Sequence, residues 1–456
     1  MHQNPSLKEV LTIARSTHKQ LNALSIFLLG IDGIIGSGIF LMPSRVYAKL
    51  GDLSMVVMPL AGIAILSIAL CFANLASKIP GDGGAWLYTY TAFGRFAGFE
   101  IGIFTWLLGI ITMATEISAF VTSLRSLFPV LNQHGPYLIT ALGILAALTG
   151  LNLMGSGFMD WVDNVSTITK VGVLVAFVVI GLSFIHPANL GNLTGSPAAT
   201  PLFSRFNQGF GMVFYMFTGF SFLPIAASKM KNPEKMLPRA LISVLLMAAG
   251  LYLVVQLTAI GVAGSGLAAA NVPIAVAFSH FAGTVGYDLA LMGMLISILG
   301  VALSVSFSTP LIASSLASEH QLLPRTLGRQ NKRGVPLQSL ILSVVICALF
   351  LLSGNYLFLA SCIVFTSFVQ YVPTIFAAIK LRHHSKLPVG FKLPGGLTIP
   401  VLALLVTMYL TLSFSVTLVL TGLGIFLVSA LWYLYDDRDR KANGLERDIS
   451  AKDRPF

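Results

Sequence analysis

Long apolar stretches, separated by short polar or glycine-rich connections, follow one another along almost the whole chain. Each of about twelve stretches is close to the ~20 residues that a helix needs to cross a bilayer. They cover residues 22–49, 53–78, 95–127, 136–154, 158–185, 206–229, 238–262, 285–317, 337–353, 355–381, 397–413 and 415–435. Because a bilayer offers no water to free backbone groups, spanning segments are helices or closed barrels, and these runs are too long for barrel strands. The pattern therefore predicts an all-α membrane protein with twelve transmembrane helices.

Two of these runs are interrupted by residues that weaken a helix. Residues 30–38 of the first run contain four glycines and Ser37, and each glycine costs a helix about 1 kcal/mol. Residues 215–221 of the sixth run read Tyr-Met-Phe-Thr-Gly-Phe-Ser and are followed by Pro224. The two interruptions open helices 1–5 and helices 6–10, and an odd number of helices makes the two sets cross in opposite directions. Interrupted helices in matching positions of inverted halves indicate a transporter site.

The runs predict one membrane domain without a soluble module. We expect the following division: a cytoplasmic N-terminal segment 1–20, a first repeat 21–185, an extracellular loop 186–205, a second repeat 206–382, helices 11 and 12 in 383–435, and a charged cytoplasmic tail 436–456. The polar first twenty residues argue against a cleavable signal peptide.

Composition and charge support this picture and orient it. Hydrophobic residues make up 55% of the chain and charged residues 10%, which no soluble globular domain shows. The net charge of +11 does not indicate a nucleic-acid partner, because lysine and arginine gather in alternate loops. Such loops face the cytoplasm, so both termini are expected there, in a multi-pass protein of the inner or plasma membrane. The cysteines Cys71, Cys347 and Cys362 lie within apolar runs and indicate neither a disulfide nor a metal site.

A broken helix in a dry environment frees backbone groups that need polar partners. The carboxylate of an amino acid suits the N–H groups and positive dipole end of the second half of helix 1. Its ammonium suits the freed carbonyls of both breaks. A glycine-rich kink without a ligand is the alternative, but two kinks in matching positions favour a site for a small amine-bearing solute.

Several strings, in this order and spacing, resemble amino acid permeases of the amino acid–polyamine–organocation superfamily over nearly the whole chain. The strings are residues 35–40 (IGSGIF), 79–85 (IPGDGGA), 92–94 (AFG), 218–220 (TGF), 230–240 (MKNPEKMLPRA) and 322–325 (LLPR). The resemblance implies a five-plus-five inverted repeat of the leucine-transporter type, with discontinuous helices 1 and 6 and two extra helices. It also implies that the substrate carboxylate lies on Ser37 and Gly38, and that Tyr215 closes the site as a gate.

The resemblance implies further substrate contacts around the breaks. The substrate amine would meet the carbonyls of Ile34, Tyr215 and Thr218. The remaining break residues are Ile35, Gly36 and Gly219. Matched back from the prolines that follow them, Ser306 on helix 8 and Thr366 and Gln370 on helix 10 complete the predicted pocket.

Two ionisable residues near the first break are functional candidates, because charges inside a membrane are costly. Lys170 resembles the helix 5 lysine of sodium-independent permeases, whose ammonium lies where sodium-coupled relatives bind a cation. It either holds the broken backbone or exchanges a proton during transport. Asp32 either pairs with Lys170 or lines an inward vestibule.

A third buried acid points to substrate charge. Aligned without gaps on arginine/agmatine-type exchangers, Glu116 falls at a position that lines the pocket for the substrate side chain. Gly109, Thr112 and Met113 share its helical face. A carboxylate there favours a cationic side chain or a second amine. The alternative is an acid near the outer surface or one paired with Arg125.

Two departures from the family pattern concern the cytoplasmic side. Asn74 and Lys229 stand where many such permeases carry a glutamate. Both changes put in doubt a simple transfer of the inner-gate salt bridges.

These features predict a secondary active transporter of amino acids that works by alternating access, independently of sodium, with proton coupling through Lys170 as an open option. Glu116 favours a cationic amino acid or its amine as substrate. A neutral amino acid transporter, a polyamine exchanger and a transport-dead amino acid sensor are the alternatives. No ATP-binding loop, metal cluster or cofactor motif is recognisable, so we expect no enzyme activity, cofactor or metal. The partners expected are a small amino acid or amine and the lipid bilayer, for a monomer or homodimer.

Overall fold

The computed structural model describes residues 23–79, 81, 83–154, 157–191, 201–230, 232–318, 321–331, 333–388 and 390–442. Within these ranges, the side chains of residues 157–161, 163, 226, 228, 229 and 439–442 are left out. The predictions for residues 1–20, for the middle of the 186–205 loop, for most of the tail and for the side chain of Lys229 therefore lie outside the described residues.

All regular elements of the described residues are helices, and every α-helix except the one at Ala85–Phe93, which lies between two predicted runs, overlaps an apolar run. The α-helices are α2 (Ala23–Ile34), α3 (Ser37–Leu50), α4 (Ser54–Ala76), α5 (Ala85–Phe93), α6 (Arg95–Leu124), α7 (His134–Asn152), α8 (Gly157–Gly181), α9 (Leu202–Met216), α10 (Pro233–Ala263), α11 (Pro273–Ser318), α12 (Leu337–Leu351), α13 (Tyr356–Lys380), α14 (Thr398–Leu410) and α15 (Val416–Ala442). This confirms the all-α class.

Eight helical stretches of the described residues are long and apolar enough to cross a bilayer, and three shorter apolar helices accompany them. One short helix, α2, is half of the first predicted run, which divides after Ile34. The helix α11 is longer than predicted, because a preceding helix joins it through a kink at Gly283 (φ 60°). The chain thus has the helices of a multi-pass membrane protein, while the total of twelve crossings and the inverted repeat remain predictions.

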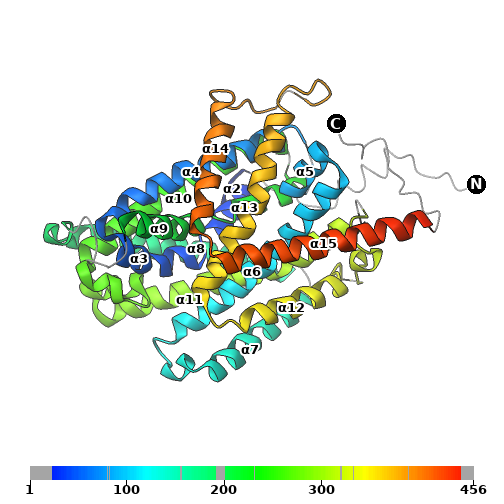
Figure 1. Ribbon diagram of the computed structural model, residues 1–456. Coiled ribbons are helices and arrows are strands. Elements are labelled where there is room, and N and C mark those ends of the chain that lie inside the picture. The colour runs from blue at the N-terminus through cyan, green and yellow to red at the C-terminus, as the bar shows by residue number, and fades with distance from the viewer. Residues whose placement is uncertain are drawn as a thin grey trace, which may run out of the picture.

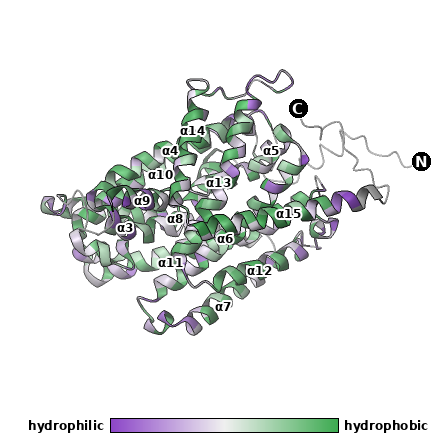
Figure 2. Cartoon of the chain, in the orientation of Figure 1, coloured by the Kyte–Doolittle hydropathy of each residue, from purple (hydrophilic) through white to green (hydrophobic). Residues whose placement is uncertain are grey.

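The long helices pack into one bundle whose outer faces are apolar. Figure 1 shows α7 and α12 along one edge of the bundle and α15 across its front, and all three helices pack against α6. Side chains such as Val428 and Ile139 are 70% and 75% exposed although apolar, as lipid-facing side chains are. Hydrophilic residues concentrate at the ends of the helices (Figure 2). This arrangement suits a bilayer as the surrounding solvent.

Both predicted helix breaks are present, and they touch each other. The helix α2 ends at Ile34 and α3 begins at Ser37, while α9 ends at Met216 before a 3-10 segment that starts after Gly219. Gly219 has φ 101°, which only glycine adopts readily, and a Cβ atom there would collide with the carbonyl oxygen of Gly33. The main chains of the two breaks therefore lie in direct contact at the centre of the bundle.

Candidate functional site

The N-terminus of α3 binds a carboxylate that belongs to the chain itself. The backbone N–H of Ser37 donates to both carboxylate oxygens of Glu116, at 3.3 and 3.2 Å, and its hydroxyl donates to Oε1 at 3.0 Å. Both residues are buried. A helix N-terminus carries a positive partial charge and free N–H groups, so it is suited to an anion. Glu116 therefore lies where the family resemblance places the substrate carboxylate.

Two features of the fold bring Glu116 to this helix end. The long helix α6, which carries Glu116, runs beside the first break. Gly36 provides the space, since a Cβ atom there would lie 2.8 Å from Oε1 of Glu116. The suggested pairing of Glu116 with Arg125 is absent, because Arg125 donates to the carbonyl of Leu131 at 3.1 Å and lies over the ring of Tyr137.

Two tyrosines cover the Ser37 hydroxyl. The hydroxyls of Ser37 and Tyr215 are 2.9 Å apart, and the hydroxyl of Tyr356 donates to Ser37 Oγ at 3.3 Å. The two tyrosine rings meet edge to face, with centroids 6.1 Å apart. The predicted gate residue Tyr215 thus contacts the predicted anion site. Sequence analysis missed Tyr356, because it begins α13 and nothing in its neighbourhood along the chain marks it.

The carbonyls freed by the breaks have partners within the chain. The hydroxyl of Tyr252, on α10, lies 3.1 Å from the carbonyl oxygen of Ile34 and 3.0 Å from that of Met216. The carbonyl of Tyr215 accepts from the hydroxyl of Thr218 at 2.7 Å. Two of the carbonyls expected to meet a substrate amine, those of Ile34 and Tyr215, therefore accept hydrogen bonds from hydroxyl groups of the chain. Tyr252 was also missed by sequence analysis.

Lys170 and Asp32 form a fully buried ion pair beside the first break. The Lys170 Nζ donates to Oδ1 of Asp32 at 2.7 Å and to the carbonyl of Ile35 at 3.0 Å, and Thr167 donates to the same carboxylate oxygen at 3.1 Å. Of the two roles considered for Asp32, the structure shows the pairing with Lys170. The ammonium of Lys170 thus holds broken backbone and a carboxylate together.

The other predicted pocket residues hydrogen-bond or pack within the surrounding helices. Gly109 packs against Thr309, Gly38 packs against Met216, and Met113 is buried. The hydroxyls of Thr112 and Thr366 donate to carbonyls one turn earlier in their own helices. Ser306 accepts from Asn152 at 2.8 Å, and Gln370 accepts from Thr105 at 3.2 Å. Their contact with a substrate remains a prediction. Among the described residues, no three His, Cys, Asp or Glu side chains group as metal ligands.

Comparison with known proteins decides the family. A family model described as amino acid permease matches residues 21–434. The chain belongs to the amino acid permease family. This confirms the resemblance drawn from the sequence strings and makes the protein a membrane permease of the amino acid–polyamine–organocation superfamily.

Three relatives show what kinds of transporter resemble this permease. An uncharacterized transporter of Mycobacterium tuberculosis is 29% identical over 87% of this chain and 88% of its own. A serine/threonine exchanger of Bacillus subtilis is 27% identical over 81% and 84%. The chloroplastic cationic amino acid transporter 9 of Arabidopsis thaliana is 28% identical over 59% of this chain and 50% of its own.

The C-terminal end of α4 in this permease contacts backbone groups after α13, and it carries Asn74 where many such permeases carry a glutamate. Asn74 donates its amide to the carbonyl of Phe391, and the N–H of Phe391 donates to the hydroxyl of Ser77 at 2.7 Å. Lys78 donates to the carbonyl of Arg382 at 3.3 Å. Burial and then the charge of Arg382 lower the pKa of Lys78. The segment after α13 is thus fastened to α4 by hydrogen bonds at Asn74.

Replacing Tyr252 with phenylalanine is expected to destabilise the permease by about 1–3 kcal/mol. The change removes the one hydroxyl that lies between the buried carbonyls of Ile34 and Met216. The measurement is the thermal unfolding of purified protein. Tyr137→Phe is the matched control, since it removes a buried tyrosine hydroxyl that donates to another hydroxyl, that of Ser118, at 2.8 Å. Equal destabilisation by both changes would contradict a special role of Tyr252 in joining the breaks.

Proposed function

We propose that this permease carries amino acids across the membrane by alternating access, independently of sodium, and that it favours a cationic amino acid or its amine. The observation that supports the proposal is the carboxylate of Glu116 on the N–H and hydroxyl of Ser37. It is a chain carboxylate in the position that an amino acid carboxylate would take. The helix end has the donors and the dipole that such a group needs.

The charge of Glu116 supports the cationic preference. Glu116, Asp32 and Lys170 lie around one break and carry two negative charges and one positive charge when ionised. When a substrate carboxylate takes the place on Ser37, Glu116 loses its donors, and a buried carboxylate without partners is costly. A cationic group on the substrate compensates that charge, and so does a proton. We therefore expect neutral substrates to need a proton that cationic ones do not.

The position of the Lys170 ammonium beside the first break is the basis for proposing sodium-independent transport. This ammonium already bridges the carbonyl of Ile35 and the carboxylate of Asp32. A fixed cation beside the freed backbone supplies the positive charge that a bound metal cation would supply. Transport would then follow from the bundle of α2, α3 and α9 rocking against α6, α7, α11 and α12.

A carboxylate-free amine is the second candidate substrate. It is favoured by the same contact, because Glu116 already fills the place on Ser37 and a diamine would not compete for it. The relatives include a serine/threonine exchanger and a cationic amino acid transporter, so the family comparison leaves the choice between neutral and cationic substrates open.

Counterflow in proteoliposomes tests the proposal. The panel pairs each cationic amino acid with its decarboxylated amine: arginine with agmatine, lysine with cadaverine and ornithine with putrescine, together with serine and leucine. We expect exchange of labelled lysine or arginine that is unchanged when choline replaces sodium, and exchange of leucine that rises as pH falls. Preferred exchange of the amines would support the second candidate. Exchange no faster than in protein-free vesicles for every compound would overturn the transport function.

A further inference from the structure

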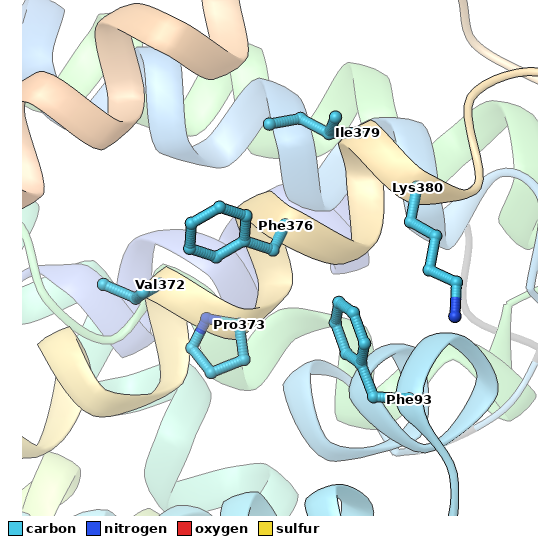
Figure 3. A pocket seen from close by; sticks show the side chains of 6 residues that line it. All are labelled: Phe93, Val372, Pro373, Phe376, Ile379 and Lys380. Atoms are coloured by element: carbon cyan, nitrogen blue, oxygen red, sulfur yellow. The ribbon is translucent and has the colours of Figure 1, made fainter.

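A cavity of about 380 Å³ lies between α5 and the inner half of α13, away from the helix breaks. Figure 3 shows the residues that line it: Phe93 at the end of α5, and Val372, Pro373, Phe376, Ile379 and Lys380 on α13. The α13 residues follow the spacing of a single helix face. Five of the six side chains are apolar, and the sixth is a cation.

The cavity opens on the outer surface of the bundle. Phe93 is 43% exposed and Phe376 is 47% exposed, so the walls are not covered by neighbouring helices. In a protein whose outer faces are apolar, such a surface meets the acyl chains of lipids. A hollow in it accepts an apolar chain more closely than a smooth helix face does, because more atoms of the chain come into contact.

The one cation of the cavity is fixed at its rim. The Nζ of Lys380 donates to the carbonyl of Ala92 at 2.6 Å and lies 5.2 Å from the centre of the Phe93 ring. An ammonium has three N–H donors, so this hydrogen bond leaves donors for a second acceptor. The cavity thus offers an apolar interior and a positive charge at one end, which matches an acyl chain attached to an anionic head group.

The position of Lys380 along the chain places the cavity at the cytoplasmic leaflet of the bilayer. Lys380 ends α13 and is followed by Arg382 and Lys386, in a loop that the positive-inside rule places in the cytoplasm. Anionic lipids give the cytoplasmic leaflet its negative surface potential, which attracts lysine and arginine by about 1 kcal/mol each. An amino acid is a poorer fit, because the lining has no side-chain acceptor for its ammonium.

We propose that this cavity binds an anionic phospholipid of the cytoplasmic leaflet, with an acyl chain against Phe93, Val372 and Phe376 and the phosphate on Lys380. The bound lipid joins α5 to α13, two elements that the Lys380–Ala92 hydrogen bond already connects. The proposal does not depend on which solute the permease carries.

The test is lipid retention, measured by native mass spectrometry of the full-length permease purified from vesicles of phosphatidylcholine with or without phosphatidylglycerol. Wild type should retain phosphatidylglycerol in preference to phosphatidylcholine. Lys380→Gln should weaken phosphatidylglycerol retention by about fivefold, the loss expected for one lysine near an anionic surface. Lys380→Arg should preserve it, and Val372→Trp, which fills the cavity, should remove it.

Two controls separate this site from general lipid contact. Lys392→Gln removes a lysine from the same loop outside the cavity lining, and Phe358→Ala changes a lipid-exposed phenylalanine (41% exposed) near the other end of α13. Both should retain phosphatidylglycerol as wild type does. Equal retention of the two lipids by wild type would overturn the proposal. So would phosphatidylglycerol retention that survives both Lys380→Gln and Val372→Trp.

Discussion

Glu116→Gln is expected to lower the ratio of lysine affinity to leucine affinity by about tenfold or more. Glutamine keeps the shape of the side chain but removes the charge, and hydrogen bonds to charged groups contribute about 1.5–3 kcal/mol, or roughly 10–100-fold in affinity. A cationic substrate thereby loses its counter-charge. For a neutral substrate, the change removes only the Glu116 carboxylate that competes with the substrate carboxylate for the N–H of Ser37. The affinity for a neutral substrate should therefore stay the same or rise. Competition in the counterflow assay measures both affinities.

Glu100→Gln is the matched control for this experiment. Glu100 is also a buried acid of α6, but its carboxylate accepts from Ser429 of α15 at 2.6 Å, away from the break. It should leave the affinity ratio near the wild-type value, because its carboxylate contacts Ser429 and not Ser37. If Glu116→Gln leaves the ratio unchanged, or if both variants lower it equally, the role of Glu116 in selecting charge is wrong.

Lys170→Ala is expected to destabilise the protein by about 3–5 kcal/mol and to abolish counterflow. It leaves the carboxylate of Asp32 buried without its cation, which is the costly way to break a buried ion pair. It also removes a donor from the carbonyl of Ile35. Thermal unfolding and counterflow on the same preparation provide the two measurements.

The double variant Asp32→Asn/Lys170→Ala tells the two roles of Lys170 apart. Removing both charges should restore much of the stability, because no unpaired charge remains. Counterflow that returns with stability, and keeps its pH dependence, would assign Lys170 a structural role. Thr167→Val is the milder control, since it removes one hydrogen bond to the Asp32 carboxylate, leaves its cation in place and should cost about 1.5–3 kcal/mol. Full stability of Lys170→Ala would contradict the importance of the pair.

The length of the apolar runs predicted the long helices, because a spanning helix must be apolar over a length that the bilayer sets. The short helix α5 lies between two runs and was missed. Helix-weakening residues in matching positions of the first and sixth runs located both breaks. The kink at Gly283 was missed, and α11 begins at Pro273 instead of near residue 285 for that reason.

The candidate site was predicted less completely than the fold. Sequence placed Glu116 on the correct helix, but its contact with Ser37 depends on how closely α6 approaches α3, which no local pattern encodes. Tyr252 and Tyr356 were missed for the same reason. Each hydroxyl contacts the first break, which lies more than 200 residues earlier in the chain and on another helix. The sequence did suggest the Asp32–Lys170 pair, because charged side chains on spanning helices are costly unless they pair with an opposite charge.

The contact between Gly33 and Gly219 has a consequence for how transporters of this kind diversify. The contact is made by main-chain atoms and needs a glycine at 219, so substitutions on other helices leave it in place. If the proposed site is right, mutations on α6 and α13 would change the accepted substrate side chain while this main-chain contact stays intact.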